Sequence, residues 1–266
     1  MRRLLLLLSL LLPVSAQATG ILTPAANPNI PGVKVLASSA IPMIKAPSGT
    51  MGNNCAISAM TALPKTYSGG AFILLPTGAI AAGVPADTAW YWFIGSSTTA
   101  GTCYNNTYTS GIPKPPASLT PFATTGPGAF AGTINTQPAV MIAIPAGTMR
   151  PNSQLVGTVR VLTNNNANSK TTDIRYGGTT VIAAVTQTTA TNGIITGWAA
   201  NRGSLSIQSI GYVLTASTSV STSFGATDGA INTGSAFNWF IEDNTAVATD
   251  YHIVDSFRLE LHEEAQ

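Results

Sequence analysis

The chain has 266 residues, of which 45% are hydrophobic and only 8% are charged. Globular domains usually carry roughly 25% charged residues, so the polarity of this chain comes from uncharged Ser, Thr, Asn and Gly. Twelve Lys and Arg against ten Asp and Glu give a net charge of +2, a balance that does not favour a nucleic-acid-binding protein.

The amino-acid usage itself predicts a fold class. Thr and Val suit strands, Gly, Asn and Pro suit turns, and the helix-forming residues Glu and Lys are scarce. The high hydrophobic content argues against disorder. We therefore expect a folded all-β protein with negligible helix outside the leader.

Residues 1–18 have the pattern of a secretory signal peptide. Arg2 and Arg3 precede a leucine-rich run over residues 4–12, and a small-x-small triplet ends at Ala18, after which we expect cleavage. The run is much shorter than the ~20 residues that a membrane span requires. We expect an exported mature chain, formally neutral and without a transmembrane segment.

Residues 19–137 are punctuated by prolines. Residues 19–50 contain five of them and little periodicity, which predicts an extended arm that packs on a partner. Residues 51–137 mix short apolar runs with Gly and Pro and predict a small β-rich module. A second cluster of five prolines in residues 112–136 predicts a linker at the end of this module.

Cys55 and Cys103 are the only cysteines. In an oxidising compartment an even number of cysteines is compatible with one disulfide. Two unpaired, buried thiols explain them equally well. Their spacing matches no metal-ligand motif, and we expect neither a metal nor a cofactor.

Residues 138–266 carry a regular strand signal, which predicts a β-sandwich. Eight strands are expected, over residues 140–144, 155–162, 171–176, 179–185, 194–198, 205–214, 237–242 and 251–261. The asparagine-rich tract at 164–169 is expected to be a hairpin-type loop.

The last expected strand alternates between apolar and polar residues, which predicts one buried face and one solvated face. The residues expected on the buried face are Ile253, Asp255, Phe257, Leu259 and Leu261. Asp255 interrupts this apolar face.

Particular strings add a family resemblance. ALPKTY (62–67), AIAAG (79–83), WYW (90–92), SSTTAGTCYNNTYTS (96–110) and TGPGA (125–129) resemble a module of bacteriophage tail fibres and other virion proteins. IPAGTMRPNS (144–153), with the asparagine-rich loop, Lys170 and RYGG (175–178), resembles the jelly-roll-like domain that follows that module. The resemblance covers residues 48–264.

This resemblance implies a virion protein with a C-terminal jelly-roll-like β-sandwich. It further implies a homotrimer around a fibre axis, contacts with other virion proteins, and a role in binding a host receptor or in capsid decoration. It supplies no catalytic motif. The leader departs from the family, since phage virions assemble in the cytoplasm, and this keeps open an exported bacterial adhesin or carbohydrate-binding module.

The residues available for catalysis predict a non-enzymatic protein. His252 and His262 are ten residues apart, which predicts a pair of surface histidines on one face of the last strand. Glu242 and Asp243 are adjacent, so their side chains should point to opposite faces of a strand rather than flank a sugar. The acidic residues that crowd the C-terminal end are expected to form a solvated rim.

The sequence also offers a candidate contact for a host receptor or glycan. Tyr104, Asn105, Asn106 and Tyr108 combine aromatic rings with amides on an expected loop. Aromatic platforms flanked by amides and hydroxyls are suited to sugar binding. The alternative is a structural turn whose tyrosines pack inward.

The leader yields a direct test. If residues 1–18 direct export, mature protein recovered from a bacterial host begins at Thr19, and its mass reports whether Cys55 and Cys103 have lost two hydrogens on pairing. Intact-mass spectrometry measures both. A chain that keeps residues 1–18 after export contradicts the expected cleavage.

Overall fold

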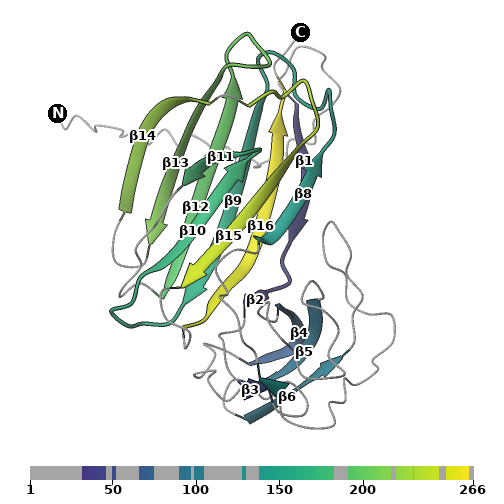
Figure 1. The fold of residues 1–266 in the computed structure, drawn as a ribbon, viewed down its shortest axis with the longest axis vertical. Helices are drawn as coiled ribbons and strands as arrows, with labels where there is room; N and C mark the ends of the chain where they lie inside the picture. Colours follow the sequence, from purple (N-terminus) through teal and green to yellow (C-terminus); the bar gives the residue numbers. More distant parts are fainter. Residues whose placement is uncertain are drawn as a thin grey trace, which may run out of the picture.

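Figure 1 shows the computed structural model of the chain as two parts, an upper β-sandwich and a smaller β-unit beside one of its ends. The structure describes residues 32–45, 50–51, 66–74, 90–96, 99–104, 128–129, 138–182, 191–216, 220–229, 231–245 and 250–263. Across these residues all regular structure is strand, and no helix is long and apolar enough to cross a membrane. The expectation of an all-β chain is confirmed there.

The strands fall into an early group and a late group. The early group is β1 (Val33–Ser39), β2 (Met43–Lys45), β3 (Thr50–Met51), β4 (Tyr67–Leu74), β5 (Trp90–Ser96), β6 (Thr99–Tyr104) and β7 (Gly128–Ala129). The late group is β8 (Pro138–Ile144), β9 (Gln154–Thr163), β10 (Lys170–Tyr176), β11 (Thr179–Ile182), β12 (Asn192–Asn201), β13 (Gln208–Ala216), β14 (Val220–Gly229), β15 (Phe237–Thr245) and β16 (His252–His262).

Two sheets carry almost all of these strands. The large sheet has the order β14-β13-β12-β9-β16-β2-β4-β5-β6, and β1 pairs with the far half of β16. The small sheet has the order β11-β10-β15-β8. All pairs in both are antiparallel except β2 with β4, which makes the large sheet mixed.

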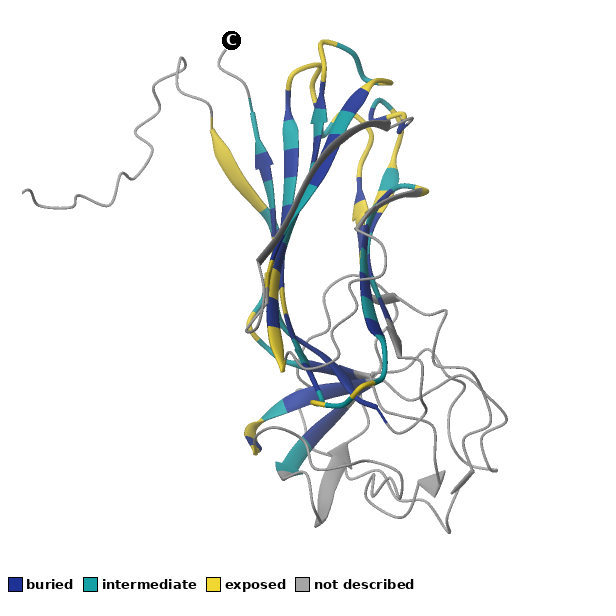
Figure 2. Ribbon diagram, turned by 90° about the vertical axis from the view of Figure 1, so that its left-hand side faces the viewer, coloured by how far each residue is buried: buried dark blue, intermediate teal, exposed yellow. Residues whose placement is uncertain are grey.

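The core lies between the sheets, which Figure 2 shows as two separate layers. Strands β9, β10 and β12 alternate along their length between buried and more exposed residues, as strands with one solvated face do. The buried residues of both sheets form one cluster, with Val159 and Ile195 from the large sheet and Ile174 and Ile241 from the small one.

The sequence pattern located most of the sandwich. Each of the eight strands expected after residue 138 overlaps an observed strand. Strand β14 was not predicted, because its Gly, Ser and Thr residues produce no apolar alternation. It is held by pairing along β13.

The expectation of an extended arm that packs on a partner is wrong for part of residues 19–50. β1 pairs with β16, and β2 joins β16 to β4, so these strands belong to the chain's own large sheet. Ala37, Met43 and Ile44 are buried. The frequent prolines of this segment suggested that it contains no strands. Pro31 and Pro42 instead precede the two strands and do not interrupt them.

The asparagine-rich tract is a loop, but the expected hairpin is wrong. It connects β9 in the large sheet to β10 in the small sheet, so the chain crosses from one layer to the other. Side-chain hydrogen bonds of its asparagines, described below, hold this crossing in place.

A β-bulge in β16 corrects the expected faces of the last strand. Val254 pairs with Val161, Ser256 pairs with the next residue Arg160, and Asp255 is the extra residue between them. A bulge shifts the alternation by one residue. Val254 therefore lies on the same side as Phe257, and Ile253 and Asp255 lie on the opposite side. Ile253 is fully buried there, as expected, whereas Asp255 is only partly buried, with Oδ2 3.6 Å from Nε of Arg160.

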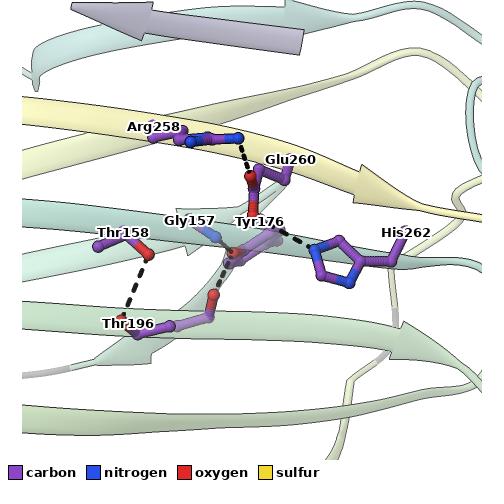
Figure 3. Close-up of polar contacts among 8 residues, drawn as sticks. Gly157, Thr158, Tyr176, Thr196, Arg258, Glu260 and His262 are labelled. Atoms are coloured by element: carbon purple, nitrogen blue, oxygen red, sulfur yellow. Dashed lines mark hydrogen bonds and ion pairs between the residues drawn. The ribbon is translucent and has the colours of Figure 1, made fainter. Parts of the chain in front are cut away.

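One tyrosine of the small sheet forms hydrogen bonds with the backbone of the large sheet. Tyr176 of β10 is fully buried, and its hydroxyl donates to the carbonyl of Gly197 (2.8 Å) and accepts from the amide of Gly157 (3.0 Å), both in the large sheet (Figure 3). Beside it, a Cβ on Gly157 would lie 2.7 Å from the ring of Trp239. A side chain larger than hydrogen at position 157 would force the sheets apart.

We expect Tyr176→Phe to destabilise the fold by about 1–3 kcal/mol, because the ring remains while buried backbone groups lose a partner. Burial raises the pKa of Tyr176. The unfolded chain releases this proton near pH 10 and the folded chain only at higher pH, so stability falls as pH rises above about 10.

Urea unfolding of both proteins at neutral pH and above pH 10 tests these two effects. The substitution should lower the urea midpoint at neutral pH. It should also reduce the loss of stability that the chain shows above about pH 10. An unchanged midpoint would show that the hydroxyl does not stabilise the contact between the sheets.

Candidate functional site

The site residues expected from the sequence fall largely outside the described part of the chain. Asn105, Asn106, Tyr108 and Cys55 lie outside it, and so does the cleavage position after Ala18. Cys103 and Tyr104 end strand β6, where Cys103 pairs with Phe93 and Tyr104 with Trp92 along the backbone. The disulfide and the tyrosine-asparagine contact stay predictions.

The structure instead brings together a buried cluster at the start of β16. Nδ1 of His252 lies 3.1 Å from Oδ2 of Asp243, and Nε2 lies 2.8 Å from the hydroxyl of Thr172. Thr172 and Asp243 are cross-strand partners on β10 and β15 of the small sheet. His252 therefore reaches across the core from the large sheet.

The expectation of two surface histidines is wrong for His252, which is 1% exposed. The bulge at Asp255 is the physical reason, because it places His252 and His262 on opposite faces although they are ten residues apart. His262 lies on the outer face, 3.3 Å from Glu260. The sequence shows the spacing but not the bulge.

A carboxylate, an imidazole and a hydroxyl in this order are the groups of a nucleophilic relay. Here Thr172 is 3% exposed and Asp243 is 1% exposed, so no substrate reaches the hydroxyl in this conformation. The hydrogen bond to Thr172 and the ion-pair contact with Asp243 link a buried side chain of the large sheet to two residues of the small sheet.

A second buried cluster anchors the crossing loop. Asp250, which is 1% exposed, accepts hydrogen bonds at one carboxylate oxygen from the side-chain amides of Asn164 (2.7 Å), Asn166 and Asn168 (3.4 Å). The ammonium of Lys170 donates to the side-chain oxygen of Asn166 and to the carbonyl of Asn168 (3.1 Å). Burial lowers the pKa of Lys170, and the negative charge of Asp250 opposes that shift.

The expected acidic rim is therefore wrong for two of its members, since Asp243 and Asp250 are buried. Their partners come from segments far away in the chain, which no local pattern reveals. Glu242 does lie on the outside, 2.9 Å from Arg175. The prediction that Glu242 and Asp243 point to opposite faces is confirmed.

Among the described residues, an accessible feature with recognition chemistry is the open face, defined as the side of β12, β9 and β16 that points away from the small sheet. Its central residues are Thr196, Trp198, Val156, Thr158, Arg258, Glu260 and His262. Among the described segments, no strand forms a third layer over it (Figure 2).

Trp198 lies along this face instead of standing out from it. A Cβ on Gly211, its cross-strand neighbour on β13, would be 2.5 Å from Cζ2 of the indole. The ring thus crosses directly over the backbone of Gly211, which is buried although it belongs to the outer side of the sheet. Trp198 itself remains partly exposed.

The same face of the sheet carries polar side chains on β12, β9 and β16. The hydroxyls of Thr158 and Thr196 are 3.3 Å apart on neighbouring strands (Figure 3). On β16, Arg258 and His262 flank Glu260, at 2.6 and 3.3 Å from its carboxylate. This side of the sheet therefore offers a flat ring, hydroxyls and paired charges.

Sequence reasoning assigned no role to Trp198. The strand IITGWAA has apolar residues on both faces, so its alternation does not show which side is buried. The signal that could have located the ring is Gly211 in a neighbouring strand, since glycine inside a strand marks a close approach. Using that signal requires the register between β12 and β13, which the sequence does not give.

No protein-family model, curated protein or solved structure that was compared with this chain matches it. Within the described ranges, no group of three or more His, Cys, Asp and Glu side chains is arranged to hold a metal ion.

The loop anchor gives a testable stability prediction. Asp250→Ala should destabilise the fold by about 3 kcal/mol or more, because three amides lose their acceptor and Lys170 is left without its countercharge in a buried place. Asp173→Ala is the matched control, since Asp173 forms a partly exposed pair with Arg175 worth at most about 1 kcal/mol. Chemical unfolding of both variants measures how much stability each one loses. Equal losses of stability would contradict a special role for Asp250.

Proposed function

We propose that this chain is a non-enzymatic virion structural protein, similar to tail fibres, that contributes to binding a host receptor. The family resemblance over residues 48–264 supports the virion role. The observation that carries most weight is the order in which the sandwich strands pair, because it supports the jelly-roll-like domain that the resemblance implies.

A jelly roll is an eight-stranded sandwich of two Greek keys. Its first strand pairs with the last, the second with the seventh, the third with the sixth and the fourth with the fifth. The same nesting follows here if the eight strands are β1, β8, β9, β10, β11, β12, β15 and β16. The pairs β1–β16 and β9–β12 lie in the large sheet, and the pairs β8–β15 and β10–β11 lie in the small sheet.

With this assignment, the remaining strands belong to insertions into the jelly roll. The segment with β2 to β7 is then an insertion between the first and second jelly-roll strands, rather than a domain that precedes the sandwich. The β13–β14 hairpin is a second insertion that widens the large sheet. An inserted unit at one end of a rigid sandwich is a suitable place for contacts with another virion protein.

The burial of the residues that could form a relay supports the proposal that the chain is not an enzyme. Among the described residues, the arrangement closest to a catalytic relay, Thr172 with His252 and Asp243, is buried between the sheets. The open face is accessible but presents binding groups. Recognition thus suits the accessible chemistry better than hydrolysis does.

An exported bacterial adhesin or carbohydrate-binding module is the second candidate, and the leader at residues 1–18 favours it. Mass spectrometry of purified phage particles from cells that carry the gene separates the two. Peptides from residues 19–266 in the particles, together with slower phage adsorption when excess soluble chain is added, support the virion role. Recovery of the chain only from the periplasm or medium would reject it in favour of the second candidate.

The same proposal includes assembly into a homotrimer. Light scattering on residues 19–266 should give three times the mass of the chain, because fibre-like proteins of the family resembled assemble around a three-fold axis. A monomer at micromolar concentration contradicts the trimer.

A further inference from the structure

We propose that the open face of the large sheet is a binding site for a neutral oligosaccharide, with the indole of Trp198 as its platform. The inference deepens the proposed receptor-binding function and rests on it for its biological role. The binding chemistry itself comes from the arrangement of Trp198, Gly211, the threonine pair and the charged row on β16.

The orientation of the Trp198 ring favours a sugar ligand. A side chain on a strand normally stands roughly perpendicular to the sheet, whereas the indole of Trp198 lies over Gly211 at a distance that leaves no room for a Cβ. One side of the ring is thus occupied by backbone, and the residue remains partly exposed. A fixed, flat aromatic surface suits the apolar face of a pyranose ring and loses little conformational entropy on binding.

Two threonine hydroxyls on the same face can form hydrogen bonds with a ligand. Thr196 is two residues from Trp198 on the same face, and its hydroxyl is 3.3 Å from that of Thr158. A hydroxyl provides one donor and two acceptor sites, so this pair retains capacity for sugar hydroxyls. A few placed polar groups beside an apolar surface are the usual means of fixing a ligand's orientation.

Charge favours a neutral ligand. The guanidinium of Arg258 lies 2.6 Å and the imidazole of His262 lies 3.3 Å from the carboxylate of Glu260, so the arginine of this row already has a carboxylate partner. An anionic sugar would have to compete with Glu260. The row lies two strands from Trp198, about 10 Å across the sheet, which allows contact with a second or third sugar unit.

The test uses the full mature chain on an array of neutral hexose oligosaccharides, with sialylated and sulfated glycans on the same array. Binding to neutral glycans that falls about tenfold or more in Trp198→Ala supports the site, since loss of a central aromatic anchor has an effect of this size. Gly211→Ala, which displaces the ring without removing it, should weaken binding in the same direction. Met141→Ala is the control, because Met141 is an exposed apolar side chain on β8 of the small sheet, and it should leave binding unchanged.

Circular dichroism and thermal midpoints of each variant show whether it is folded. A folded Trp198→Ala chain that binds as well as the original overturns the proposal, and so does binding restricted to anionic glycans. If soluble chain slows phage adsorption and Trp198→Ala does so equally, the receptor role stands and this site is rejected. If neutral glycans bind through Trp198 but the chain is absent from particles, the site stands and the virion role is rejected.

Discussion

The close approach of Tyr176 to the opposite sheet is the constraint on which the sandwich depends. Its hydroxyl reaches backbone groups of Gly157 and Gly197, so the layers must come together at glycine positions. Trp239, the cross-strand partner of Tyr176, needs the same absence of a Cβ at Gly157. Large rings on the small sheet thus fit over bare backbone on the large one, and dense packing of this kind leaves little freedom in the distance between layers.

A tryptophan ring also lies over a glycine at two places away from this contact. Trp92 occupies the space above Gly70, which has a positive φ of 90°, and Trp198 lies over Gly211 on the open face. Each pairing removes glycine backbone from water and fixes a large ring against a neighbouring strand. What differs is the surroundings: the ring of Trp92 is buried, while that of Trp198 keeps part of its surface exposed.

Polar clusters fix the two ends of the sandwich in a comparable way. At one end, Asp250 gathers the amides of the crossing loop and Lys170 balances its charge. At the other end, Asn201 donates to the carbonyl of Arg150 and to the hydroxyl of Thr233, and accepts from Gln208. Hydrogen bonds between buried groups of this kind favour one arrangement of the segments that they join.

How far the sequence predicts this molecule depends on whether a feature is local. Alternation along a single strand is local, and it located eight of the nine strands of residues 138–266, all but β14, and the opposite directions of Glu242 and Asp243. Burial of His252 and Asp250 depends on partners from β10, β15 and the crossing loop, and one unpredicted bulge at Asp255 reverses the face of every residue before it. A single-residue shift has this effect because the side-chain period of a strand is two.

The open face follows from the same non-local register. Val156, Trp198 and Gly211 lie in one row across three strands, so the platform exists only when β9, β12 and β13 pair as they do. In the described part of the sandwich the inner faces pack together, and polar groups hold the loop after β9 and the segment before it, so the proposed recognition falls on an outer face. With few charged residues in the chain, selectivity in the proposed binding would come from shape, aromatic contact and uncharged hydrogen bonds, which the row through Trp198 combines.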